Sequence, residues 1–89
     1  MIDFAIITAT GRDKPGLIAE ITSAMARANG NIVDIEAFSM RGLFAIFMIL
    51  DCRNLAIPAD RLKAQLLNIG GKIGLEVTME PYVAGRRRS

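Results

Sequence analysis

The sequence has no histidine, no tryptophan and one cysteine, Cys52. A lone cysteine forms no intrachain disulfide and no metal site built on paired cysteines, which favours a reducing, cytoplasmic location. Histidine is the commonest general base in enzymes, and the few hydroxyl side chains have no obvious base beside them. We therefore expect no catalytic residues, no metal and no cofactor.

Long apolar runs and a broad excess of positive charge are missing as well. No run reaches the ~20 residues of a membrane-spanning helix, and no signal pattern precedes the first apolar segment. Of the eleven lysines and arginines, three are Arg86, Arg87 and Arg88, so residues 1–85 carry eight basic against nine acidic side chains. We expect a soluble domain over residues 1–83 and a disordered basic tail over 84–89, with no nucleic-acid surface of the usual basic kind.

Aliphatic residues, by contrast, are abundant. Hydrophobic residues make up 52% of 89 positions. A chain of this length buries only roughly 60–65% of its unfolded surface, so one small core does not readily hide so much apolar area. We expect self-association, with a homodimer as the simplest form.

The hydrophobic periodicity predicts six elements. Residues 3–10 form a short apolar strand that a glycine stops, and a helix follows from Pro15 to an ending at Asn29-Gly30. Residues 31–40 form a strand with Val33, Ile35 and Ala37 on one face, and with Ile32, Asp34, Glu36, Phe38 and Met40 on a mixed, partly covered face.

A tight hairpin at Arg41-Gly42 leads into residues 43–50, which are apolar without alternation and therefore predict a strand buried on both faces. A second helix opens at Pro58 and is closed by Gly70-Gly71. The last strand alternates from Ile73 to Met79, and Pro81 places it at an edge.

The order strand, helix, strand, strand, helix, strand predicts an α+β ferredoxin-like sandwich, in which two helices cover one face of a four-stranded antiparallel sheet. The other face should then be open, yet the third strand is apolar on both sides. We expect a second subunit or a partner domain to cover part of that face.

Gly11 and Gly16 have the outer spacing of a phosphate-binding loop. That chemistry next needs a lysine and a hydroxyl, where this chain has Leu17 and Ile18, so nucleotide hydrolysis is excluded. An RNA-recognition platform is also disfavoured. The segment RGLFAIFM at 41–48 has no aromatic residues at the stacking positions, and Phe44 and Phe47 should face opposite ways.

The segment TGRDKPGLI, residues 10–18, can instead form a ligand site. Backbone N–H groups of Gly16 and Leu17 at a helix start suit a carboxylate, Asp13 can receive an ammonium group, and Lys14 or Arg12 can add a contact to the carboxylate. These parts suit a zwitterionic amino acid. Alternatively, Asp13 only caps the helix.

The segments DKPGLIAEIT and NGNIVDIEAF, within this order of elements, resemble the ACT domain family over residues 2–82. ACT domains are regulatory modules that commonly bind amino acids at a dimer interface, where the loop after the first strand meets the second strand of the neighbour. The resemblance implies contacts from a loop and helix start at Asp13, Lys14, Pro15, Gly16 and Leu17, and from Asn31 and Ile32. Serine-binding members carry a histidine where this chain has Gly11, which argues against serine.

The chain looks similar to small stand-alone ACT proteins, which act through a partner. We therefore expect a homodimer that binds a small ligand and regulates an enzyme or regulator of amino-acid metabolism. The alternatives are a structural subunit of an enzyme complex that binds no ligand and, more weakly, an RNA-binding module. The sequence names neither the ligand nor the partner, and it leaves open whether sheet edges or sheet faces pair.

Overall fold

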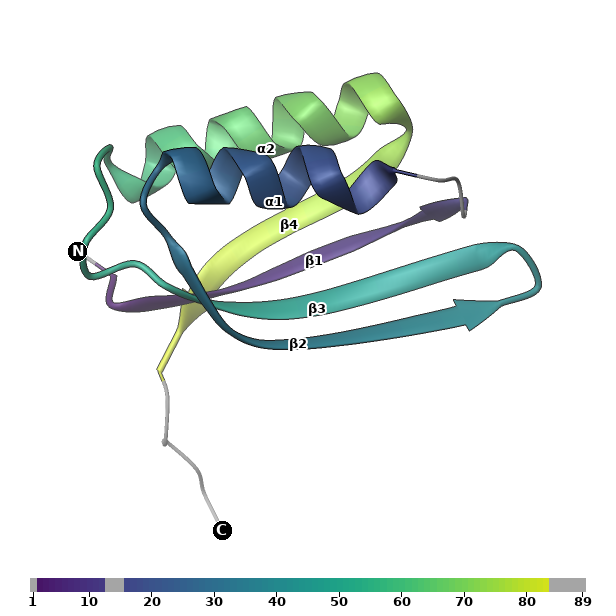
Figure 1. The fold of residues 1–89 in the computed structure, drawn as a ribbon, viewed down its shortest axis with the longest axis horizontal. Helices are drawn as coiled ribbons and strands as arrows, with labels where there is room; N and C mark the ends of the chain where they lie inside the picture. The colour runs from purple at the N-terminus through teal and green to yellow at the C-terminus, as the bar shows by residue number, and fades with distance from the viewer. Residues whose placement is uncertain (1, 13–15, 84–89) are drawn as a thin grey trace, which may run out of the picture.

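The computed structural model describes residues 2–12 and 16–83, with the side chain of Leu17 outside the description. The predicted sandwich domain over 1–83 is therefore seen apart from residues 1 and 13–15, and the predicted tail at 84–89 lies outside the described residues. The elements follow the predicted order (Figure 1): β1 (Phe4–Arg12), α1 (Leu17–Arg27), β2 (Asn31–Met40), β3 (Leu43–Asp51), α2 (Ala59–Ile73) and β4 (Leu75–Tyr82).

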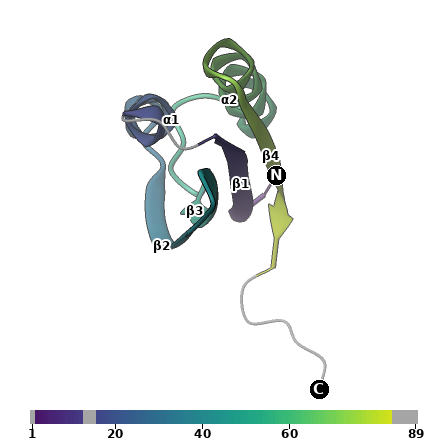
Figure 2. The ribbon, with the colours of Figure 1, turned by 90° about the vertical axis from the view of Figure 1, so that its right-hand side faces the viewer.

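The strands form one antiparallel sheet in the order β2-β3-β1-β4. Figure 2 shows α1 and α2 side by side on one face of this sheet, and the opposite face has no helix over it in the described part of the chain. The ferredoxin-like prediction is confirmed. β4 is an edge strand, as Pro81 predicts, because proline has no backbone N–H to donate to a further strand beyond β4.

The core lies between the helices and the sheet. The strands contribute alternate residues to it, as a pleated strand must, and the helices contribute one stripe each. Each large side chain that is removed from water stabilises the fold by about 1.5–3 kcal/mol. The largest fully buried ones are Ile7, Ile21, Met25, Met48, Leu50, Leu62 and Leu66.

The turn between β2 and β3 has the predicted tight geometry. Arg41 and Gly42 have φ angles of 49° and 81°, and Met40 pairs directly with Leu43 across the turn. Two successive positive φ values define the hairpin turn whose twist matches that of its strands. The hairpin prediction is confirmed.

Gly11 and the pair Gly70-Gly71 were predicted to end elements but do not end them. β1 continues through Gly11 to Arg12, and α2 continues through Gly70 and Gly71 to Ile73, so that Ile73 is helical and the helix ends at Gly74, whose φ is 84°. A Cβ on Gly11 would lie 2.7 Å from Leu75 Cδ2, and one on Gly70 would lie 2.5 Å from Val77 Cγ2. Both glycines allow close approach to β4.

The predicted faces of β2 are also partly wrong. A β-bulge interrupts the pairing with β3 between Ile32 and Asp34, so Ile32 lies opposite Leu50 and shares the helix-side face with Ile35 and not with Asp34. An extra residue in one strand reverses the alternation beyond it. Apart from Ile32, every residue of β2 is exposed.

β3 is not buried on both faces within one chain. Its helix-side residues, from Phe44 to Leu50, are buried, whereas Leu43 and Phe47 on the open face are 55% and 42% exposed. The prediction that a partner covers this face stays a prediction.

Candidate functional site

Gly16 and Leu17 lie at the start of α1 as predicted, although the helix begins at Leu17 and not at Pro15. Gly16 occupies the N-cap position with a left-handed φ of 81°, and its carbonyl oxygen accepts the N–H of Ala19 at 3.2 Å. A helix start directs backbone N–H groups and the positive end of the helix dipole outward. The other loop residues of the predicted site, Asp13, Lys14 and Pro15, lie outside the described residues.

Asn31 and Ile32 open β2, at the other end of the same helix. Asn31 is exposed and lies opposite Asp51, while Ile32 is half-buried against the core. The chain reaches this position directly after Gly30, whose N–H closes α1 by donating to the Met25 carbonyl oxygen at 2.9 Å.

One chain does not bring the two halves of the predicted site together. The end of β1 at Arg12 pairs with Leu43, whereas Asn31 pairs with Asp51, and Leu43 and Asp51 are the two ends of β3. Nine residues of strand span about 27 Å. Figure 1 shows the end of β1 and the start of β2 at opposite ends of the sheet.

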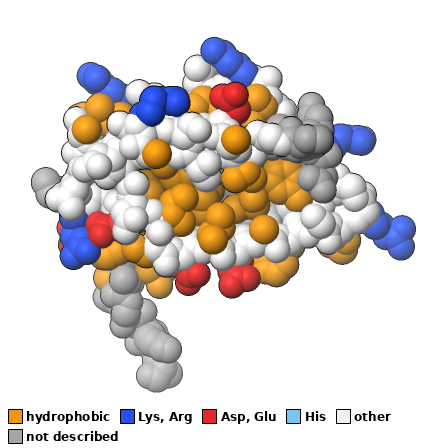
Figure 3. Space-filling view, in the orientation of Figure 1, with side chains coloured by type: hydrophobic (Ala, Val, Ile, Leu, Met, Phe, Trp, Pro, Cys, Tyr) orange, Lys and Arg blue, Asp and Glu red, His pale blue; other side chains and the backbone are white. Residues whose placement is uncertain are grey.

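The edge strand β2 carries exposed apolar side chains on both of its faces. On the helix side Ile35 is 46% exposed, and on the other side Phe38 and Met40 are 57% and 70% exposed. Figure 3, which looks onto this side of the molecule, shows hydrophobic side chains gathered between α1 and the rim of the sheet. An exposed edge strand that carries apolar side chains can pair with another chain.

Sequence reasoning missed a hollow on the open face of the sheet, near the β2–β3 turn. It has a volume of about 470 Å³, and its apolar lining includes Phe38, Met40, Leu43 and Ala45. Phe38 packs edge-to-face on Phe47 with ring centroids 6.1 Å apart. The alternation of outward residues along residues 38–47 is the signal that could have located it.

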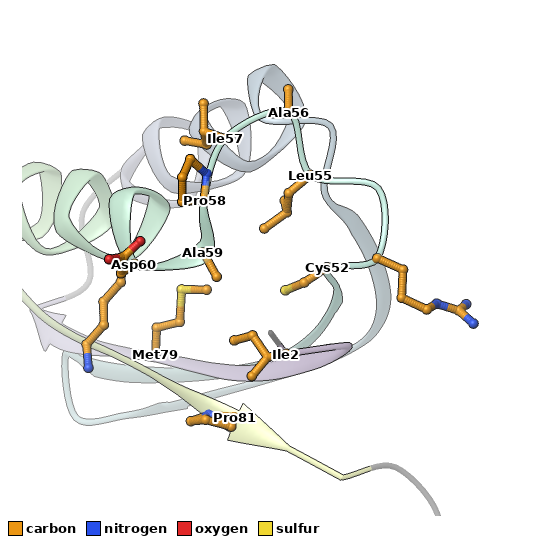
Figure 4. Close-up of a pocket in the computed structure, with 12 residues that line it drawn as sticks. Ile2, Cys52, Leu55, Ala56, Ile57, Pro58, Ala59, Asp60, Met79 and Pro81 are labelled. Carbon is orange, nitrogen blue, oxygen red and sulfur yellow. The ribbon is translucent and has the colours of Figure 1, made fainter.

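A larger cavity of about 740 Å³ opens between the start of α2 and β4. Figure 4 shows Cys52, Leu55, Ala59 and Met79 pointing toward it, together with Ile2. Cys52 is buried, and its burial, followed by the Asp51 charge, raises the pKa of the thiol. A protonated, buried thiol is a small apolar group and a poor nucleophile.

Arg53, which lines this cavity, is bound to Asp51 at the end of β3. The guanidinium donates to both carboxylate oxygens, at 2.9 and 2.7 Å, and the backbone N–H of Arg53 donates at 3.0 Å. These bonds, the side-chain ones most of all, lower the pKa of Asp51 to about 2. The same guanidinium lies 5.1 Å from the centre of the Phe4 ring, so the ion pair ties β3 to β1.

This ion pair predicts an acid-dependent contribution to stability. Because the pKa of Asp51 is lower in the folded chain than the ~3.9 of an unfolded aspartate, the contribution is present above about pH 4 and is lost as the pH falls toward 2. In the wild type the thermal unfolding midpoint, measured by circular dichroism, should fall between pH 4 and 2. This fall should be smaller in Asp51→Asn and in Arg53→Gln. An unchanged acid limb in both variants would contradict the assignment.

The described residues offer little for the other chemistries considered. Among residues 2–12 and 16–83, no group of three or more metal-ligating side chains comes together, and no helix is long and apolar enough to span a membrane. Phe44 is buried on the helix side while Phe47 lies on the open face, as predicted, and Asp34 and Glu36 share that open face.

Comparison with known proteins identifies the family. The sequence model of the ACT domain matches residues 3–80. The UPF0237 protein MMP0657 of Methanococcus maripaludis is 35% identical over 75 residues, which are 84% of this chain and 83% of that protein.

Two solved structures resemble this fold. An ACT domain protein from Streptococcus pneumoniae superposes with a TM-score of 0.78 at 20% identity, covering 97% of both chains. The regulatory subunit of aspartate kinase from Thermus thermophilus superposes with a TM-score of 0.69 at 21% identity, covering 90% of this chain and 52% of that one. At these identities the likeness shows the fold alone.

Proposed function

Because this chain belongs to the ACT domain family, we propose that it is a cytoplasmic, homodimeric regulatory module that binds an amino acid and controls an enzyme or regulator of amino-acid metabolism. One observation supports the proposal. The end of β1 and the start of β2, which border the two halves of the predicted site, lie at opposite ends of the sheet, and the exposed edge strand β2 runs from one end to the other. A second copy can supply the missing half at each end.

The dimer pairs β2 of one copy with β2 of the other, antiparallel about a twofold axis. Backbone groups along the ten-residue strand then find partners. The exposed Val33 and Ile35 are covered at the same time by the helix layer of the second copy. Pairing of the sheet edges is therefore favoured over pairing of the open faces.

Antiparallel pairing also completes the site. It moves the partner's Asn31 from the far end of its own strand to the end where this copy has Arg12 and the start of α1. Each dimer then has two equivalent sites, and each site takes its loop from one chain and its strand from the other. Ile32 follows Asn31 into the same junction.

The two parts suit the two charges of an amino acid. The N–H groups at Gly16 and Leu17 receive the carboxylate, with the Lys14 ammonium as a second contact, and Pro15 sets the backbone angle of the approach to the helix. The Asp13 carboxylate receives the α-ammonium group, and the amide of Asn31 across the interface orients it. These roles of residues 13–15 follow from the sequence.

Regulation follows if the ligand binds one state more tightly than another. A ligand held across the β2 edge has its full site only in the dimer, so it shifts the population toward the dimer and toward whichever partner-bound state preserves that junction. The activity of the regulated protein then changes with the fraction of dimer that has ligand bound.

Thermal unfolding of the pure protein against each of the twenty amino acids tests the proposal. At 100 times its dissociation constant a ligand should add about 2.7 kcal/mol per site, and a domain of this size should then melt roughly 10–20 °C higher. Light scattering on the same samples should give the mass of a dimer.

Two outcomes contradict the proposal in different ways. The absence of any shift with all twenty amino acids would favour the alternative, a structural subunit that binds no ligand and docks through its exposed sheet face. A monomeric mass at micromolar concentration would exclude the shared site and leave the exposed β2 edge unexplained.

A further inference from the structure

The open face of the sheet has an apolar strip along β3 that Ile6 of β1 extends, whereas Thr8 and Thr10 of β1 are polar. The outward residues of the two central strands include Ile6 on β1 and Ala45, Phe47 and Ile49 on β3, and Ile6 lies directly opposite Ile49. Leu43 extends this strip toward the β2–β3 turn. Pairing through the β2 edge leaves this face uncovered, since the edge and the face are different surfaces.

Acidic side chains flank the strip on both sides. Asp34 and Glu36 project from β2 onto the open face, and Glu76 and Glu80 project onto it from β4. Glu80 lies 3.7 Å from Lys63 Nζ, but its side chain remains 63% exposed. In the row Asp34, Ile49, Ile6 and Glu80 the face is therefore acidic at both edges and apolar between them, and in the next two rows threonines of β1 lie between the apolar strip and β4.

The width of this pattern matches a helix. Strands in a sheet are about 4.8 Å apart, so β2 and β4, with two strands between them, are separated by about 14 Å. An α-helix with its side chains is about 10–12 Å across. A helix lying along the apolar strip would place the two flanks of its own surface beside the two rows of carboxylates.

The hollow near the β2–β3 turn provides an anchor point. Phe38, Met40 and Leu43 line its apolar part, and Thr10 and Glu76 stand at its other side. Its volume of about 470 Å³ is ample for one large apolar side chain. Glu76 at the rim would meet a basic residue next to that anchor.

Charge decides which occupant fits. A second copy docked face to face would set its own acidic flanks against these, and RNA would bring phosphates to the same carboxylates. We infer that the open face of the sheet docks an amphipathic helix of a partner protein, one with an apolar stripe and lysine or arginine on both flanks. This inference goes beyond ligand binding and stands whether or not an amino acid binds.

Two synthetic helical peptides of eighteen residues test the inference. Both carry the same leucine stripe, one with lysine and the other with glutamate on the flanks, and each is titrated into the ¹⁵N-labelled protein without any amino acid. The lysine-flanked peptide should bind about tenfold more tightly or better, because several exposed ion pairs add up. It should shift the amide signals of Ala45, Phe47 and Thr10, and its affinity should fall with salt.

Matched charge variants distinguish the effect of the carboxylates on this face from the effect of the net charge of the protein. Glu36→Lys with Glu76→Lys changes two flanking carboxylates of the face, whereas Glu20→Lys with Asp60→Lys makes the same change of charge on the helices. The first pair should reverse the preference toward the glutamate-flanked peptide, and the second should leave it in place. Circular dichroism of both variants shows whether the fold is kept.

Three results would overturn the inference: no binding of either peptide, equal affinity for both, or equal effects of the two variant pairs. An assembly larger than the dimer that is lost on Phe47→Ser would assign the face to a second copy instead. Since the titration contains no amino acid, its failure is distinguishable from failure of the ligand-binding proposal.

Discussion

A heterodimer of an Asp13→Ala chain with an Asn31→Ala chain is expected to bind about one amino acid, whereas a homodimer of either variant binds none and the wild-type dimer binds about two. The reason is the shared site. In the mixed dimer both lesions fall in the same junction, between the loop of one chain and the strand of the other. The second junction keeps an intact loop and an intact Asn31.

The measurement uses two affinity tags, so that only dimers carrying both are purified. Calorimetric titration with the amino acid that gives the largest thermal shift then counts the sites. Asn31 is exposed, so its replacement should cost little stability. Ser23→Ala, an exposed change on α1, provides a control that should retain both sites in any combination.

The stoichiometry separates the possible arrangements. No binding by the mixed dimer would mean that each site takes Asp13 and Asn31 from the same chain, or that the dimer pairs differently. Binding of two ligands would mean that neither residue makes an essential contact. A count near one in the mixed dimer, together with no binding by either homodimer, supports a site completed across the β2 edge.

Gly70→Ala is expected to destabilise the protein by about 1–3 kcal/mol, the usual cost of forcing an extra methyl group into a packed core. The new Cβ would lie 2.5 Å from Val77 Cγ2 and 3.0 Å from the Leu75 carbonyl oxygen. α2 would have to move away from β4 to make room. At about 4–8 °C per kcal/mol in a domain of this size, the fall in midpoint is readily measured.

Gly71→Ala is the matched control for this prediction. Gly71 is the next residue of the same helix, but a Cβ there meets nothing within 4 Å in the described structure. Alanine has a higher helix propensity than glycine, so this change should stabilise by about 0.5–1 kcal/mol. Urea unfolding of both variants should give opposite signs, and equal effects would show that α2 lies further from β4.

Local pattern was enough to predict the elements and their order. The change from strand to helical period near Pro15, the glycine turn at Arg41-Gly42 and the position of Pro81 each depend on residues close in sequence. Backbone preferences and hydrophobic periodicity act over such short distances. The ferredoxin-like topology followed from the order, because crossover handedness leaves few alternatives.

The errors arose where distant segments meet. Glycine usually interrupts a strand or a helix, yet Gly11 and Gly70 both lie inside regular elements. Glycine is needed there because the backbone lies close to Leu75 and Val77 of β4. Likewise, the bulge that transfers Ile32 to the helix side exists only in the pairing of β2 with β3. Neither contact is visible in the spacing of residues along the chain.

The candidate site divides in the same way. The sequence alone determined which groups suit an amino acid: the helix start at Gly16 and Leu17, the charges of Asp13 and Lys14, and Asn31 at the head of the next strand. Only the tertiary structure decided that the end of β1 and Asn31 lie far apart within one chain, because antiparallel pairing puts Arg12 and Asn31 at opposite ends of β3. Residue chemistry is a property of sequence, whereas distance depends on how the strands pair, and that distance is the reason why the proposed site includes a second copy.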